Sequence, residues 1–188
     1  EADLNTGRVE MGGTGSNSEA LLVFGGNPGP GLYAITENFD GTSWTEVADL
    51  STARQNLSSH IGSTTAALAA GGHDASDRTA STEEWTTTPS ALFQKTVEGQ
   101  LFFNSTTNTF KETITDLPAG TWASQTNINT ARGLGAGCGT KDSALIYGGF
   151  THPPGVTYAQ TEEWNGSTWT EKGDLNVPFY YVDSGGLG

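Results

Sequence analysis

One pattern occurs three times in this chain: a short apolar run that ends in a pair of glycines. The copies read EALLVFGG, TAALAAGG and DSALIYGG, at residues 19–26, 65–72 and 142–149. A glutamate followed by an aromatic residue comes after each pair, as ENF, EEW and EEW at residues 37–39, 83–85 and 162–164. A chain that repeats itself in this way is built from similar supersecondary units that pack on one another.

A second repeated segment joins the units. It reads LNTGR, LSTAR and INTAR at residues 4–8, 50–54 and 128–132, and a fourth copy at 175–179, LNVPF, lacks the arginine. The starts of these segments lie 46, 78 and 47 residues apart, so the middle unit carries about 32 extra residues. We therefore divide the chain into repeats 4–49, 50–127 (insertion about 86–117) and 128–174, and a partial repeat 175–188.

Each unit has room for four short strands. They are expected after the arginine, before the glycine pair, around the Glu-aromatic element and around a later tryptophan. Asp40-Gly41 and Asn165-Gly166 lie between such runs, and these dipeptides are typical of tight hairpin turns. The chain has 26 glycines and only 15% charged residues, which excludes a helical bundle. The sequence predicts an all-β protein whose units are sheets of four antiparallel strands.

The repeat resembles the Kelch motif of β-propellers: four apolar residues, a glycine pair, a variable loop and two spaced aromatic residues. The resemblance covers nearly all of residues 1–188 except the insertion, and it implies one propeller or a propeller fragment made of Kelch-like blades. Ala69 and Ala70 depart from the pattern, because they are smaller than the residues before the other two glycine pairs.

The segments LSTARQNL (residues 50–57) and TEEWNGSTWTEKGDLN (residues 161–176) also resemble Kelch-like repeats in structural proteins of marine bacteriophages. The inserted segment 99–111 looks like short hairpins of phage fibre and tail proteins, and it supplies Phe102, Phe103 and Phe110 as a candidate assembly hairpin. This resemblance implies a virion structural or attachment protein, on the particle surface or otherwise extracellular. Its partners would be other virion proteins, copies of itself, or a host-surface glycan or receptor.

The repeats alone do not determine how the ring of a propeller would be completed. Propellers usually have about four to eight blades, and three units with part of a fourth are too few. We expect a longer parent chain, because the sequence begins and ends inside repeats; the alternatives are association of copies and an open stack with exposed edge strands.

The charge excludes several classes of partner. The formal charge is −13 and the pI is near 4.3. Such an acidic surface repels phosphate groups, which disfavours binding to nucleic acid and to anionic lipid. The longest apolar run, residues 20–24, is far too short to insert across a membrane. The single cysteine, Cys138, lies among glycines and is expected to be a small buried residue.

Arg8, Arg54 and Arg132 occupy one position in successive repeats. Three converging arginines could hold a carboxylate, which would allow a sialidase-like, glycan-cleaving enzyme. The alternative is that each arginine binds backbone carbonyls or a repeated glutamate where units meet, and we favour it because the arginine belongs to the repeat itself. Adjacent glutamates such as Glu83 and Glu84 face opposite sides of a strand, so they do not suit acid–base catalysis together.

Other catalytic signals are missing from the sequence. The histidines lie at different positions in the units, and no nucleophile elbow, phosphate-binding loop or zinc motif occurs. We expect no enzyme activity, no cofactor and no metal site.

The loops after the glycine pairs differ between units, and variable loops on a rigid scaffold are where partners bind. Aromatic and imidazole rings there suit stacking on sugars or protein groups. The candidate binding residues are Tyr33, His73, Phe150, His152 and Tyr158.

Overall fold

The computed structural model describes residues 2–58, 60–87, 101–104, 109–112, 120–151 and 155–180. All regular elements among these residues are β-strands, which confirms the all-β prediction. The first sheet has the order β1 (Gly12–Asn17), β2 (Ala20–Phe24), β3 (Thr36–Phe39), β4 (Trp44–Val47). The second has β5 (Ala66–Ala70), β6 (Thr82–Thr87), β9 (Gly120–Gln125). The third has β10 (Ala136–Thr140), β11 (Ser143–Tyr147), β14 (Thr161–Trp164), β15 (Trp169–Glu171).

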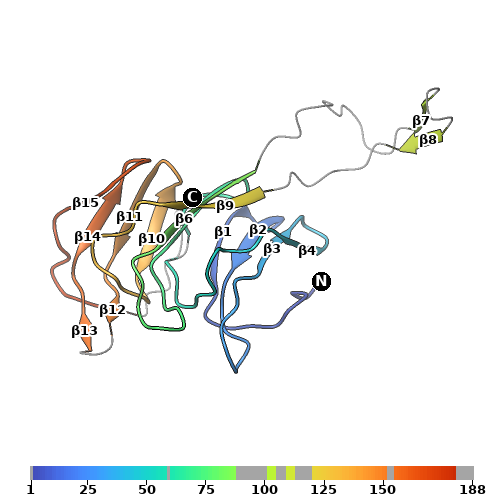
Figure 1. Cartoon of the computed structure of the whole chain (residues 1–188). Coiled ribbons are helices and arrows are strands. Elements are labelled where there is room, and N and C mark those ends of the chain that lie inside the picture. Colours follow the sequence, from blue (N-terminus) through green and yellow to red (C-terminus); the bar gives the residue numbers. More distant parts are fainter. Residues whose placement is uncertain are drawn as a thin grey trace.

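The three sheets fan out from one another (Figure 1). β1 and β10 lie toward the middle of the molecule, β4 and β15 lie at its two outer edges, and β6 and β9 run between the flanking sheets. All neighbouring strands within a sheet are antiparallel. Each sheet corresponds to one repeat of the sequence.

The turns predicted at Asp40-Gly41 and Asn165-Gly166 are present. They connect β3 to β4 and β14 to β15, and both glycines have positive φ. The Asp40 carboxylate accepts the backbone N–H groups of Thr42 and Ser43, and Asn165 accepts those of Ser167 and Thr168 in the same way. These backbone hydrogen bonds hold the pKa of Asp40 below its usual value.

The middle repeat differs from the prediction of four strands, because the strand expected after Arg54 is reduced to two isolated bridges. Ser58 pairs with Ala70 and Gly62 pairs with Ala67. Between them the backbone of His60 takes the left-handed conformation, with φ of 66°. The N–H groups of His60 and Gly62 donate to the flanking sheets, at Gly13 and Gly139. This segment therefore lies along β5 as an irregular edge of its own sheet, and it also bonds to the inner strands of both neighbouring sheets.

The hydrophobic core lies between the sheets, in two clusters that meet at β5. Alternate residues of a strand point to opposite faces. Ala67 and Ala69 accordingly pack toward the first sheet, against Leu22 and Phe24, whereas Leu68 and Ala70 pack toward the third. These four residues of β5 are fully buried. The small side chains of Ala69 and Ala70, which departed from the repeat, thus belong to a strand covered on both faces.

The same backbone joint connects each sheet to the next unit. The N–H of the second glycine donates to the carbonyl of the next arginine position, and the leucine position donates to an alanine carbonyl. The first bond is Gly26–Arg54 (2.7 Å), Gly72–Arg132 (2.9 Å) and Gly149–Phe179 (2.9 Å). The second is Leu50–Ala34 (3.0 Å), Ile128–Ala80 (2.9 Å) and Leu175–Ala159 (2.9 Å). We call this set of bonds the inter-sheet joint.

The first glycine of each pair is required by the joint. At Gly25, Gly71 and Gly148 φ is +65° to +67°, which favours glycine. A Cβ atom at Gly71 would lie 2.5 Å from the carbonyl oxygen of Arg132, and one at Gly25 would lie 2.4 Å from that of Arg54. The glycine pair is therefore the point of closest approach between units.

The insertion lies between β6 and β9, which pair directly with each other. Within it, β7 (Leu101–Asn104) pairs with β8 (Thr109–Glu112) as an antiparallel two-stranded sheet, so a hairpin is present where one was predicted. The side chains of Phe102, Phe103 and Phe110 lie outside the described part of the structure.

Candidate functional site

Each repeated arginine forms a buried ion pair with a glutamate of its own repeat. The guanidinium comes from the segment before the sheet, and the carboxylate comes from the strand after the glycine pair. The pairs are Arg8–Glu37, Arg54–Glu83 (2.6 Å) and Arg132–Glu162 (2.7 Å). Their side chains are at most 2% exposed.

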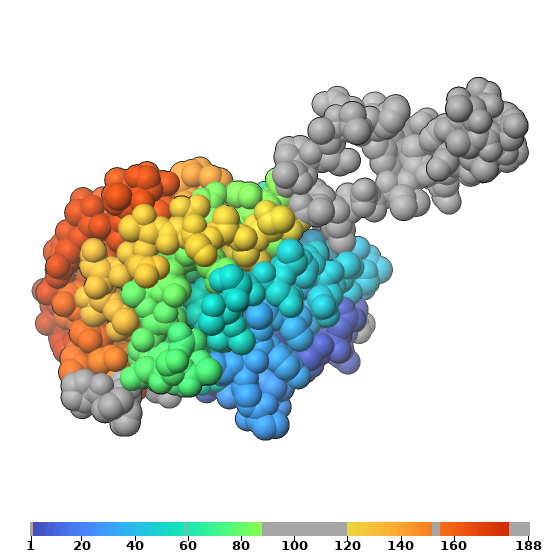
Figure 2. Space-filling model, in the orientation of Figure 1, coloured from blue at the N-terminus to red at the C-terminus, as the bar shows by residue number. Residues whose placement is uncertain are grey.

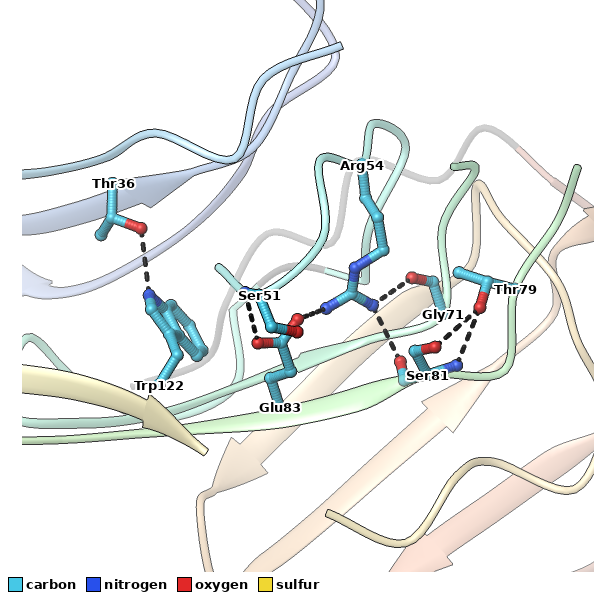
Figure 3. A network of polar contacts seen from close by, with 8 residues as sticks. All are labelled: Thr36, Ser51, Arg54, Gly71, Thr79, Ser81, Glu83 and Trp122. Atoms are coloured by element: carbon cyan, nitrogen blue, oxygen red, sulfur yellow. Dashed lines mark hydrogen bonds and ion pairs between the residues drawn. The ribbon is translucent and has the colours of Figure 1, made fainter. Parts of the chain in front are cut away.

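Figure 3 shows the pair in the second sheet. Arg54 also donates to the carbonyls of Gly71 and Ser81, each at 2.9 Å, and the second oxygen of Glu83 accepts the backbone N–H of Ser51 at 2.8 Å. Burial lowers the pKa of the Arg54 guanidinium, and the carboxylate of Glu83 opposes that shift. The Arg54–Glu83 pair thus holds three parts of the repeat together: its first residues, the glycine pair and strand β6.

The glutamates of the other sheets bind in the same manner. Glu37 accepts the N–H of Asn5 at 2.8 Å, and Glu162 accepts that of Asn129 at 2.7 Å. Burial also lowers the pKa of Arg132, against the opposing charge of Glu162. The three guanidiniums therefore stand in three different sheets, each against its own carboxylate, and do not form the common carboxylate-binding group that a sialidase-like site requires.

Adjacent glutamates lie on opposite sides of their strands, as predicted. Glu83 is 1% exposed and faces Arg54, whereas Glu84 lies 3.2 Å from the amino group of Lys141 on the third sheet and accepts from Gln125. Glu163 similarly turns away from its neighbour and pairs with Lys172 at 2.7 Å. Neither doublet brings two carboxylates to one substrate.

The loops after the glycine pairs lie at one end of the three sheets. Loops 27–33 and 73–78 lie along the same lower edge of the molecule as the two-stranded sheet of β12 (Phe150–Thr151) and β13 (Val156–Thr157) of the third repeat (Figure 1 and Figure 2). The residue after each pair bonds back to the segment that follows the arginine, through Val9–Asn27, Gln55–His73 and Gly133–Phe150 bridges. The loops therefore start from fixed positions on the scaffold.

Four of the five candidate binding residues lie at this end. Tyr33 and Tyr158 are equivalent, since each donates its N–H to the carbonyl of the second glycine, at 2.8 and 2.9 Å. Both are half-buried. Phe150 stacks on Tyr180 with ring centroids 4.9 Å apart. His73 is half-buried, and its Nδ1 has no hydrogen-bond partner in the described structure. His152 lies outside the described residues.

Arg78 belongs to the same end, and it is not among the binding residues predicted from the sequence. It forms a bridge with His73, and its side chain lies against Gly133 of the third repeat. Among the arginines and lysines whose side chains the structure describes, Arg78 alone has no carboxylate within ion-pair distance. The available signal was its position, because the other three arginines fall on the repeat and Arg78 does not.

Neither a metal site nor a membrane-spanning helix is found among the described residues. They contain no group of three or more His, Cys, Asp or Glu side chains that could hold a metal ion. They also contain no helix long and apolar enough to cross a bilayer. Cys138, expected to be buried, is partly exposed on β10.

No protein-family model and no curated protein matches this chain. Among solved structures it is similar to that of a protein called YjhT, with a TM-score of 0.64 at 13% sequence identity. The match covers 96% of this chain and 59% of the YjhT chain, so the present chain spans about three fifths of that protein. At this identity the similarity concerns the fold alone.

Proposed function

We propose that this protein is a non-catalytic binding module, in which Kelch-like blades of a β-propeller hold variable loops for a partner. The support for Kelch-like blades is the threefold repeat, with its glycine pairs, aromatic residues and four-stranded first and third sheets. The partner is a surface glycan or a protein of a host cell, and the setting is the surface of a virus particle.

One observation carries the proposal: the charged residues of the repeat are bound to each other inside the sheets, and the loops that differ between repeats lie together at one end. Arg54 and Glu83 are 0% and 1% exposed, so they serve the scaffold. Tyr33, Arg78 and Tyr158 come from three different repeats and reach the loop end without belonging to the Arg–Glu motif. Loops on a rigid scaffold can be altered for binding without loss of the fold.

The chemistry of the loop end fits a glycan. Tyrosine rings stack on the apolar faces of sugar rings, and their hydroxyl groups bind the sugar hydroxyls. Arg78 adds a cation for a carboxylate or sulfate of an acidic sugar, despite the overall negative charge. A neutral or acidic host-surface polysaccharide is therefore the ligand class to test first.

The test uses a replacement that the chain already contains. Thr79 occupies the position of Tyr33 and Tyr158 in the middle repeat, donating its N–H to Gly72 at 3.0 Å, so Tyr33→Thr and Tyr158→Thr are compatible with the fold. We expect the double variant to bind host cells or their isolated polysaccharide at least about tenfold more weakly. Adsorption to labelled cells measures the change.

Thr42→Ala is the matched control, because Thr42 is exposed in the β3–β4 turn, at the opposite end of the first sheet. Equal adsorption by wild type and the double variant, with both folded, would contradict loop binding. The remaining candidate would then be a purely structural role, as a decoration or joint of the particle.

A further inference from the structure

Gly133 departs from the other repeats, because the equivalent residues carry side chains. It stands directly after the repeated arginine, where the first two repeats have Val9 and Gln55. All three residues form the same bridge, with the residue that follows a glycine pair. The φ of Gly133 is not in the left-handed region, so its backbone does not require glycine. The reason for the missing side chain therefore lies in what occupies its space.

Arg78 of the middle repeat occupies this space. A Cβ atom at Gly133 would lie 3.1 Å from Cδ and 3.2 Å from Nε of Arg78. Arg78 belongs to the loop after the second glycine pair, whereas Gly133 belongs to the third repeat. The arginine side chain thus crosses the joint between the second and third sheets, and the absence of a side chain at Gly133 lets it lie on the backbone there.

The guanidinium of Arg78 is held in this position without a polar partner. An arginine has five N–H donors, and the side chain of Arg78 donates none of them to a described residue. Its Nε is buried, whereas its two terminal nitrogens are not enclosed. Arg54, by comparison, uses both terminal nitrogens on carbonyls and a carboxylate. The free terminal nitrogens of Arg78 are therefore open to a ligand at the loop end.

The two carboxylates of the same loop bind the backbone of the loop itself. Asp74 accepts the N–H groups of Ser76 at 2.7 Å and of Asp77 at 3.2 Å, and Asp77 accepts the backbone N–H of Arg78 at 2.7 Å. Neither lies within ion-pair distance of the Arg78 guanidinium. The positive charge of Arg78 is thus not paired within the described structure.

We infer that Arg78 binds a carboxylate or sulfate group of the ligand, so that the glycan of the proposed binding function, on which this inference rests, is an acidic one. The two terminal nitrogens of a guanidinium match two oxygens of such a group. His73 stands opposite Arg78 in a backbone bridge, which places the imidazole ring on the same side of the loop. Arg78 therefore selects the ligand, and Gly133 is a positioning residue for it.

The experiment is a titration of the isotope-labelled chain with single sugars, followed by the amide and arginine Nε–H signals in NMR spectra. Three probes share one sugar ring: glucuronate carries a carboxylate, a glucose sulfate ester carries a sulfate, and glucose carries neither. At constant ionic strength we expect saturable shifts in residues 73–78 and at Gly133 with at least one of the two anions, with a dissociation constant of roughly 1–10 mM. Glucose should give none. A response to one anion alone identifies the group that Arg78 binds.

Arg78→Leu should raise the dissociation constant at least about tenfold. The first repeat has Leu32 at the equivalent position, so the replacement is compatible with the fold. Lys172→Leu is the matched control, because it removes the same charge from an exposed side chain that pairs with Glu163, and it should leave binding unchanged.

Gly133→Gln keeps the charge of Arg78 but fills the space in which its side chain lies. Glutamine is the residue that the second repeat has at this position, as Gln55. This variant should bind the anion at least about threefold more weakly, since the guanidinium loses its fixed position. Thermal unfolding of each variant confirms that it is folded.

Shifts that do not saturate by about 50 mM with either anion would overturn the inference. Equal dissociation constants for the wild type and a folded Arg78→Leu would do the same, as would equal binding of glucose and the two anions. These outcomes leave the proposed function standing with a neutral glycan, provided that adsorption still depends on Tyr33 and Tyr158. Equal adsorption by the wild type and the double tyrosine variant contradicts the proposed function even where Arg78 binds an anion.

Discussion

Glu83→Gln should destabilise the protein by about 3–5 kcal/mol, because it leaves the guanidinium of Arg54 buried without a countercharge. Arg54 is fully buried, and the pair is one of the polar contacts that hold the middle repeat together. Native domains are stable by only about 5–15 kcal/mol, so the variant should be largely unfolded at modest denaturant concentration. Urea unfolding followed by tryptophan fluorescence measures the loss.

Glu84→Gln is the control that separates burial from charge. Glu84 is the next residue on the same strand and loses only a partly exposed contact with Lys141, which we expect to cost less than about 1 kcal/mol. The double variant Arg54→Met, Glu83→Leu removes both charges and should recover much of the stability. If Glu83→Gln and Glu84→Gln lowered the free energy of unfolding by similar amounts, the buried Arg54–Glu83 pair would contribute no more to stability than a partly exposed contact.

Gly71→Ala is the second change with a large expected effect. The new Cβ would stand 2.5 Å from the carbonyl oxygen of Arg132, and φ of +65° is unfavourable for alanine. The clash is with backbone, so the second and third sheets must move apart and the Gly72–Arg132 hydrogen bond weakens. We expect a loss of about 2–4 kcal/mol in the free energy of unfolding, from overpacking and backbone strain together. Calorimetry of the variant gives this value.

Gly7→Ala provides the comparison within the same repeat motif. Nothing lies within 4 Å of a Cβ at Gly7, and its φ is not in the left-handed region. This variant should be neutral or slightly more stable, since alanine restricts the unfolded chain. Equal free energies of unfolding for Gly71→Ala and Gly7→Ala would contradict the close approach of the two sheets at the glycine pair.

Much of the scaffold could be predicted from the sequence, because each repeated residue has one structural task. The glycine pairs, the Asp40-Gly41 and Asn165-Gly166 turns and the separation of Glu83 from Glu84 all follow from local backbone rules. The binding of the arginines within the repeat, preferred over a convergent site, is confirmed by the three ion pairs.

The parts that escaped prediction depend on contacts between repeats. The strand expected after Arg54 is reduced to bridges along β5, because His60 has left-handed φ and its N–H and that of Gly62 bond to the neighbouring sheets, which no pattern within one repeat encodes. Arg78 was missed because it lies in a variable loop, where its only signal is that it stands off the repeat position of the other three arginines. Its place near Gly133 follows only from how two sheets pack.

Hydrogen exchange of backbone amides tests most directly whether the joints make the three sheets one rigid scaffold for the loops. We predict that the Gly26, Gly72 and Gly149 amides exchange as slowly as amides inside the strands, because each is bonded to the next unit. Gly29, whose N–H is bound only to the side chain of Asn27 in an exposed loop, should exchange much faster. Exchange of the Gly26 and Gly72 amides at the rate of Gly29 would show instead that the sheets separate from one another and do not form one rigid scaffold.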